Sequence, residues 1–129
     1  MLELKDFEEA KKRVDEVIIP TPLIYSLAFS KECRNMVYIK PENLQRTGAF
    51  KIRGAYNKIM KMDDESKSRG LIASSAGNHA QGVAYAAQQL GVKATIVMPA
   101  HTPLIKVDAT KALGAEVVLH GEVYDDAYN

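Results

Sequence analysis

The sequence has a single cysteine, Cys33, and no apolar run near the roughly 20 residues that a membrane-spanning helix needs. One cysteine excludes an intrachain disulfide and favours a reducing compartment, so we predict a cytoplasmic protein that binds no membrane. An excess of charge of one sign is also lacking, because 17 Lys and Arg residues face 16 Asp and Glu residues. The chain therefore lacks the usual electrostatic attraction to phosphate backbones, and we expect no nucleic-acid partner.

Motifs for metals and nucleotides are missing as well. The three histidines, His79, His101 and His120, lie far apart in the sequence and form no compact metal-ligand pattern. The eight glycines are scattered, so the sequence contains neither G-x-G-x-x-G nor a P-loop. We therefore predict no metal site, and the motifs give a nucleotide site no support.

What the sequence does contain is an α/β pattern. Helical spacing of apolar residues predicts helices over residues 6–17 and 50–62. A polar segment, residues 63–70, breaks the pattern and is typical of a surface connection or a domain boundary. Residues 71–120 then read as strand, helix, strand, helix, strand. This order predicts a parallel sheet with helices packed on it.

The first segment that could carry chemistry is Thr47-Gly-Ala-Phe-Lys-Ile-Arg-Gly54. It places Lys51 in the first turn of a helix, where the partial positive charge of the helix N-terminus disfavours a cation. Together with the apolar neighbours Phe50 and Ile52, this setting favours the neutral amine that imine formation requires. The alternative is that Lys51 extends to water, as most lysines do. For Arg53 we expect an exposed helical ion pair.

The second segment is Ser74-Ser-Ala-Gly-Asn-His-Ala-Gln-Gly82, between a predicted strand and a predicted helix. Small residues let a ligand approach the backbone, and free N–H groups at a helix start attract a carboxylate or phosphate. The carboxyl ends of strands are also where open α/β sheets bind ligands. The alternative is a tight turn in which Ser75 or Asn78 acts as the helix N-cap.

In this order and spacing, the two segments resemble the threonine dehydratase and serine dehydratase/racemase group. These are pyridoxal phosphate (PLP) enzymes with the tryptophan-synthase-β-like fold, also called fold type II. Residues 41–55, PENLQRTGAFKIRGA, are similar to the cofactor-lysine segment of that group, with Ala49 where serine is usual. Residues 75–82, SAGNHAQG, are similar to its substrate-carboxylate loop. The resemblance reaches across most of the chain.

The resemblance implies a role for each site residue. Lys51 would form the imine with PLP and, once substrate displaces it, remove the α-proton as general base. Phe50 would lie against the cofactor ring, and Asn78 would hydrogen-bond its 3′-oxygen. Ser75 and the backbone N–H groups of residues 76–79, which are Ala76, Gly77, Asn78 and His79, would hold the substrate carboxylate. Loss of the β-hydroxyl of L-threonine, and of L-serine, would give a 2-oxo acid and ammonia.

Ala76 bears on the choice of reaction. Racemases of the group carry at this position a serine that acts as acid and base on the opposite cofactor face, which alanine cannot do. The sequence therefore favours elimination. Three alternatives stay open at this point: a serine racemase, a β-replacement enzyme of the same fold, and a non-catalytic α/β module that binds an anion.

The resemblance also implies an incomplete enzyme. Residues 1–66 would be the N-terminal part of the larger PLP-binding domain, and residues 67–129 an incomplete smaller βαβαβ domain with the carboxylate loop. A loop for the PLP phosphate and a partner for the pyridine nitrogen are absent. We therefore expect a fragment that is inactive by itself, of an enzyme that forms a homo-oligomer at full length.

Overall fold

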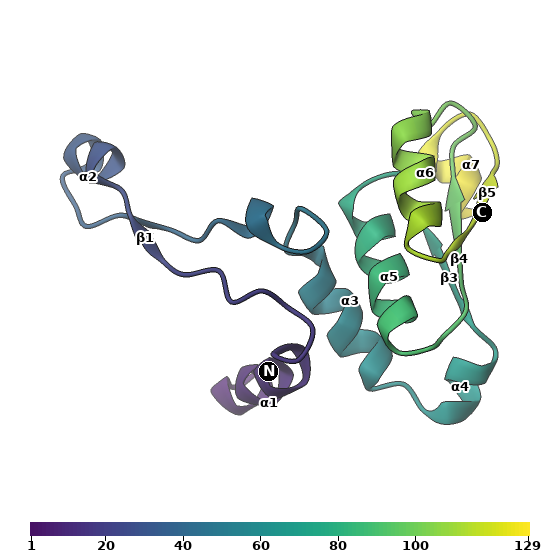
Figure 1. Cartoon of the computed structure of the whole chain (residues 1–129), viewed down its shortest axis with the longest axis horizontal. Coiled ribbons are helices and arrows are strands. Elements are labelled where there is room, and N and C mark those ends of the chain that lie inside the picture. Colours follow the sequence, from purple (N-terminus) through teal and green to yellow (C-terminus); the bar gives the residue numbers. More distant parts are fainter.

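The computed structural model describes all of residues 1–129, which form a layered α/β body and an arm that extends away from it (Figure 1). The elements are, in chain order, α1 (Leu4–Val14), β1 (Ile24–Tyr25), α2 (Leu27–Cys33), β2 (Tyr38–Ile39), the 3-10 turn η1 (Glu42–Leu44), α3 (Lys51–Met60), α4 (Asp64–Ser68), β3 (Leu71–Ser74), α5 (Asn78–Gln89), β4 (Ala94–Met98), α6 (Leu104–Ala112), β5 (Glu116–Leu119) and α7 (Tyr124–Tyr128). We call residues 24–39 the arm. None of the helices combines the length and apolar character that crossing a bilayer requires.

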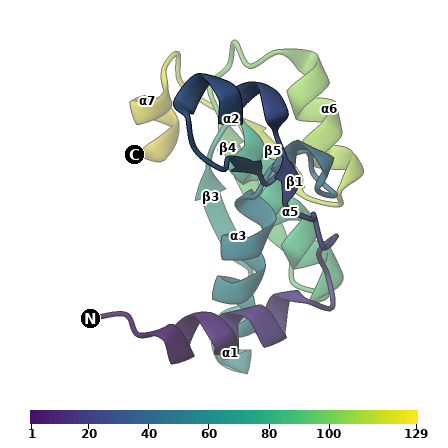
Figure 2. The ribbon, with the colours of Figure 1, turned by 90° about the vertical axis from the view of Figure 1, so that its left-hand side faces the viewer.

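The body is built on the parallel sheet that the sequence predicts. Its strand order is β3-β4-β5, with Leu71 paired to Ala94 and Thr95 to Glu116. The central strand β4 alternates between buried and half-buried residues, as a strand covered by helices on one face does. Helices α5 and α6 lie on one side of the sheet and α7 on the other (Figures 1 and 2). The predicted α/β class with a parallel sheet is therefore confirmed.

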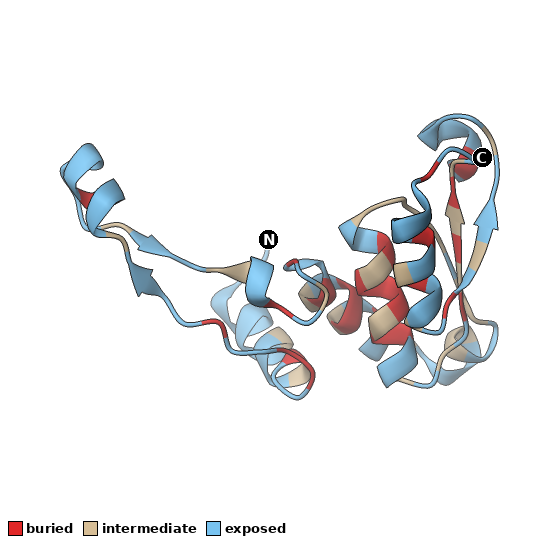
Figure 3. Cartoon of the chain, turned by 45° about the horizontal axis from the view of Figure 1, so that its top comes forward, coloured by how far each residue is buried: buried red, intermediate tan, exposed pale blue.

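The hydrophobic core lies between the sheet and helices α3 and α5. Figure 3 shows buried residues concentrated on these two helices, on α6 and on β4, whereas the arm is almost entirely exposed. Helix α5 presents Ala80, Ala84 and Ala87 to the core, and small side chains of this kind let neighbouring helices approach closely. One cluster of buried side chains includes Ile52 and Ile59 of α3 as well as these residues of α5. The core therefore continues across residues 63–70, and the division into domains after residue 66 stays a prediction.

The arm is a two-stranded antiparallel ribbon that carries α2 at its tip. Strand β1 pairs with β2, and the rings of Tyr25 and Tyr38 meet edge to face with centroids 5.5 Å apart. The apolar side chains of both strands are exposed, Ile24 and Ile39 among them. The sequence gives no firm signal for α2, which begins after the N-cap Ser26.

The predicted helices differ from the observed ones mainly at their ends. The helix expected over residues 6–17 is α1, and the helix expected over residues 50–62 is α3. The polar segment 63–70 is not an irregular connection, because it contains the short helix α4. Its N-cap is Asp63, whose carboxylate accepts a hydrogen bond of 2.6 Å from the Ser66 N–H.

Candidate active site

Lys51 is the first residue of α3, and its amine makes no hydrogen bond or ion pair. The chain reaches this position through Gly48, whose φ of +68° suits glycine, and whose N–H donates to the Gln45 carbonyl at 2.8 Å. The Lys51 Nζ lies 5.3 Å from the centroid of the Phe50 ring, and Phe50 is 58% exposed. A free amine and an accessible aromatic face thus stand side by side at the start of the helix.

The loop before α5 leaves the start of that helix uncapped. The N-cap residue is Gly77, which offers no side chain, so the alternative in which Ser75 or Asn78 caps the helix is wrong. The Ser75 hydroxyl instead accepts a hydrogen bond of 3.3 Å from the Gly77 N–H within the loop. This bond turns the serine side chain back over its own loop.

Several backbone N–H groups at this helix start have no acceptor in the chain. Those of Ala76, Asn78 and His79 donate to no protein group, whereas that of Gly77 is occupied by Ser75. The Ala80 N–H is also without an acceptor, although this residue is fully buried. Because a buried N–H without a partner is costly, the free groups fit an anionic ligand oxygen. The sequence pattern indicates residues 75–79 and gives no signal for Ala80.

The packing of α3 against α5 brings the two segments together. A Cβ placed on Gly82 would lie 3.1 Å from both the Ile52 N and the Lys51 C, and 3.2 Å from the Lys51 Cβ. Gly82 follows Asn78 by one turn on the same helix face, so Lys51 stands about one turn from the free N–H groups. The two segments predicted separately from the sequence therefore form neighbouring walls of one site.

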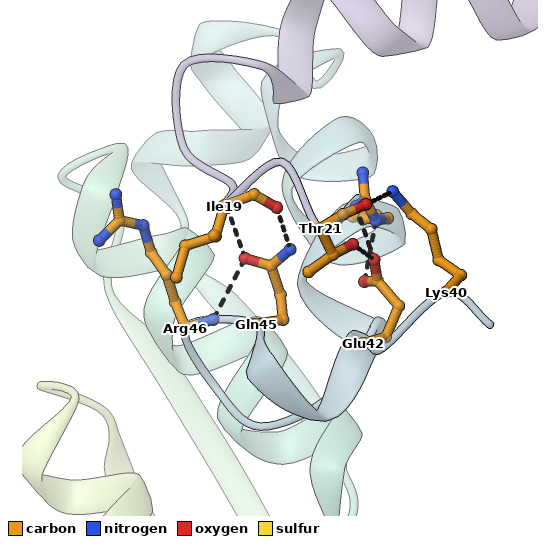
Figure 4. Close-up of polar contacts among 7 residues, drawn as sticks. Ile19, Thr21, Lys40, Glu42, Gln45 and Arg46 are labelled. Carbon is orange, nitrogen blue, oxygen red and sulfur yellow. Dashed lines mark hydrogen bonds and ion pairs between the residues drawn. The ribbon is translucent and has the colours of Figure 1, made fainter. Parts of the chain in front are cut away.

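Arg53 does not make the exposed helical ion pair that its sequence position suggests. Its guanidinium donates to both oxygens of Glu42, at 3.0 Å through Nε and 2.7 Å through Nη2, and the two side chains are 30% and 16% exposed. The Thr21 hydroxyl donates to the same carboxylate at 2.6 Å, and Lys40 binds the Thr21 carbonyl (Figure 4). The bonds from Arg53 and then Thr21 lower the pKa of Glu42 from 4.5 to about 2, and Glu42 raises the pKa of Arg53.

A second set of bonds holds the loop that precedes Lys51. The buried Gln45 amide accepts from the Ile19 N–H at 2.7 Å and donates to the Ile19 carbonyl at 2.9 Å (Figure 4). Arg46 Nε donates to the Val17 carbonyl at 2.9 Å. Through these hydrogen bonds, residues 17–21 hold the loop before Lys51 in place. The sequence offers no signal for these pairings, because the partners are far apart along the chain.

The remaining candidates lie elsewhere or contribute only through the backbone. His79 lines an apolar hollow of about 330 Å³ together with Gly54 and Val83, so only its N–H belongs to the free groups. His120 is exposed beyond β5, and its N–H donates to the Met98 carbonyl at 2.9 Å. No group of three or more His, Cys, Asp or Glu side chains is placed to hold a metal ion.

Comparison with known proteins decides the family. A family of proteins described as "Pyridoxal-phosphate dependent enzyme" matches residues 14–129. The chain belongs to this family. The predicted fold type and dependence on pyridoxal phosphate are thereby confirmed.

Relatives within the family agree with the sequence prediction. An L-threonine ammonia-lyase from Thermotoga maritima is 52% identical over 128 residues, which cover 99% of this chain and 32% of that enzyme. A serine racemase structure from Dictyostelium discoideum has a TM-score of 0.91 at 36% identity, over 98% of this chain and 41% of that one. A threonine deaminase structure from Solanum lycopersicum has a TM-score of 0.85 at 42% identity, over 98% and 36%. The chain spans about a third of the length of the curated relatives it matches.

The residues present fit the cofactor of the family. The amine of Lys51 is unbonded, the Phe50 face beside it is exposed, and the start of α5 offers N–H groups without acceptors. In addition, each segment contains a buried hydroxyl without a partner, Thr47 in the first and Ser74 in the second. These unsatisfied polar groups are suited to a ligand that is rich in oxygen.

Proposed function

We propose that this chain supplies the cofactor lysine and the carboxylate loop of a PLP-dependent threonine ammonia-lyase, with L-serine as a second substrate. The observation that carries the proposal is the unbonded amine of Lys51, on a residue whose backbone packs about one helical turn from the free N–H groups of α5. The 52% identity to the Thermotoga enzyme supports the choice of substrate.

Each residue has a defined task in this proposal. When bound, PLP supplies an electron sink for the charge left at the substrate α-carbon. Lys51 attaches the cofactor and, when released, accepts the α-proton, while Phe50 lies along the cofactor ring and Asn78 hydrogen-bonds it. The carboxylate binds to the Ser75 hydroxyl and to the free N–H groups of Ala76, Asn78 and His79 at the uncapped start of α5. The β-hydroxyl leaves with a proton as water, and the C–N bond is then hydrolysed by one water, whose oxygen becomes the 2-oxo group while the nitrogen leaves as ammonia.

The test uses a completed enzyme, by which we mean this chain followed by the C-terminal two thirds of the Thermotoga maritima relative. With PLP, the completed enzyme should release 2-oxobutanoate and ammonia from L-threonine but not from L-alanine, which has no β-hydroxyl to lose. The 129-residue chain alone should release none. Borohydride reduction followed by peptide mapping reports separately whether the cofactor is attached to Lys51. Attachment at Lys51 without any 2-oxobutanoate would refute the proposed reaction.

Serine racemase is the second candidate, because the Dictyostelium racemase has a TM-score of 0.91 to this chain. Ala76 argues against it, since a methyl group cannot deliver a proton to the second face of the cofactor. This part of the proposal is refuted if the completed enzyme interconverts L- and D-serine as fast as it releases ammonia.

Replacing Ala76 by serine should add racemisation. The substitution adds a hydroxyl, which can donate and accept a proton, to the loop that carries the free N–H groups. We expect the formation of D-serine from L-serine to rise at least about tenfold, because a positioned acid–base group accelerates proton transfer. Chiral chromatography of the products measures the change. Ala76→Gly is the matched control without a hydroxyl, and an equal rise in both variants would contradict the argument.

A further inference from the structure

Gly82 is the one glycine in the interior of α5, a helix otherwise rich in alanine. Alanine is the better helix former, so glycine at this position needs a reason other than helix stability. The reason is its surroundings. A Cβ would stand 3.1 Å from the backbone of Lys51 and Ile52, tighter than ordinary van der Waals contact, and the atoms that it meets are mostly backbone.

The place of this contact matters because it lies beside both walls of the site. On one side it touches the residue whose amine would attach the cofactor. On the other it is one turn from Asn78, the first residue of α5 and one of those with a free N–H group. The missing Cβ therefore lets the start of α3 approach the start of α5 more closely than any other residue would allow.

Ordinary core packing does not account for the position. Ala84 and Ala87 of the same helix are also buried, yet they carry a methyl group without difficulty. The other helical glycine, Gly54 of α3, has no atom within 4 Å of the position that a Cβ would take, so its lack of a side chain serves no contact within this chain. The close approach is thus specific to the point where α5 passes Lys51.

We infer that Gly82 is a positioning residue, which fixes the separation between the amine of Lys51 and the carboxylate-binding start of α5. The inference rests on the proposed function in taking these two groups as partners for one amino-acid substrate. An amino acid bound to the cofactor and to the loop at once spans this separation, so its binding depends on the contact at Gly82. A ligand that binds to the cofactor alone does not.

Two ligands of the completed enzyme distinguish binding at both the cofactor and the loop from binding at the cofactor alone. Glycine carries both an amine and a carboxylate, whereas methylamine carries the amine alone, and each shifts the cofactor absorbance when it displaces Lys51. In Gly82→Ala, the concentration of glycine that gives half the shift should rise about tenfold, because a displacement of a few tenths of an ångström misaligns two points of attachment. The value for methylamine should stay within twofold. Gly54→Ala is the matched control, and both of its values should stay within twofold.

Other outcomes overturn the inference. If glycine and methylamine weaken together, the substitution disturbs the cofactor site or the fold and not the separation. If neither changes, the separation does not depend on Gly82. Gly82→Ser tests the same contact with a second small side chain and should reproduce the selective effect on glycine. The titrations require no turnover, so a completed enzyme that binds both ligands but forms no 2-oxobutanoate refutes the proposed reaction while still testing Gly82.

Discussion

Replacing Lys51 by alanine in the completed enzyme is expected to lower the rate of L-threonine deamination by about 10⁴-fold or more. The substitution removes both the attachment point of the cofactor and the base that accepts the α-proton, and a positioned base alone contributes about 10² to 10⁴. No other residue replaces it in this chain, because Lys51 has the only amine in the first turn of α3. The rate of 2-oxobutanoate release measures the effect.

The control is Lys58→Ala, two turns along the same helix and likewise exposed. It should change neither the deamination rate nor the cofactor absorbance. Borohydride reduction gives an independent readout, since it should label the peptide with Lys51 in the unchanged protein and label no peptide of this chain in Lys51→Ala. A label on a different lysine, with activity retained, would show that Lys51 is not the cofactor lysine.

Replacing Glu42 by glutamine is expected to lower the free energy of unfolding more than any other substitution proposed for this chain. The carboxylate receives hydrogen bonds from Arg53 and Thr21 and is mostly buried, so its loss removes the ion-pair partner of the Arg53 guanidinium. Because both side chains keep some contact with water, we expect a decrease of about 2 to 3 kcal/mol in the free energy of unfolding at pH 7. Urea unfolding of the completed enzyme measures it.

The pH dependence identifies the cause. The folded state lowers the pKa of Glu42 from 4.5 to about 2, so the stabilisation is fully present above pH 4.5 and is lost as the pH falls through about 2. The difference between the unchanged protein and Glu42→Gln should therefore shrink over this window. Glu65→Gln is the control, because the Glu65–Arg69 pair is 82% and 69% exposed and adds little. A difference that stays constant from pH 7 to pH 2 would rule out the charge of Glu42 as its origin.

The parts of the site that the sequence predicts are local ones. Lys51 and the loop that begins at Ser75 are each marked by neighbours within a few residues, and the parallel sheet follows from the alternation of strands and helices. Their fit to one site depends on the packing of α3 on α5, and Gly82 marks the point of closest approach. A glycine among alanines indicates a close contact with the helix, but the sequence does not show which segment makes that contact.

The pairings missed from the sequence join residues far apart along the chain. Arg53 faces Glu42 because η1 folds back beside α3, and spacing within a helix cannot predict that. The uncapped start of α5 was also hidden, since Ser75 and Asn78 are both common N-cap residues. Tertiary geometry decides that the Ser75 hydroxyl bonds the Gly77 N–H within the loop, while the helix N–H groups stay free.

The arm has a consequence for how the isolated chain behaves in solution. Its two strands have two residues each, and a ribbon this short is marginally stable in water. The outer edges of β1 and β2 are unpaired and stand beside the exposed apolar side chains of Ile24, Tyr25 and Ile39. Such a surface promotes association between copies at high concentration. We therefore expect oligomers of the 129-residue chain to form through the exposed apolar surface of the arm. Such oligomers do not show how the subunits of an enzyme are arranged.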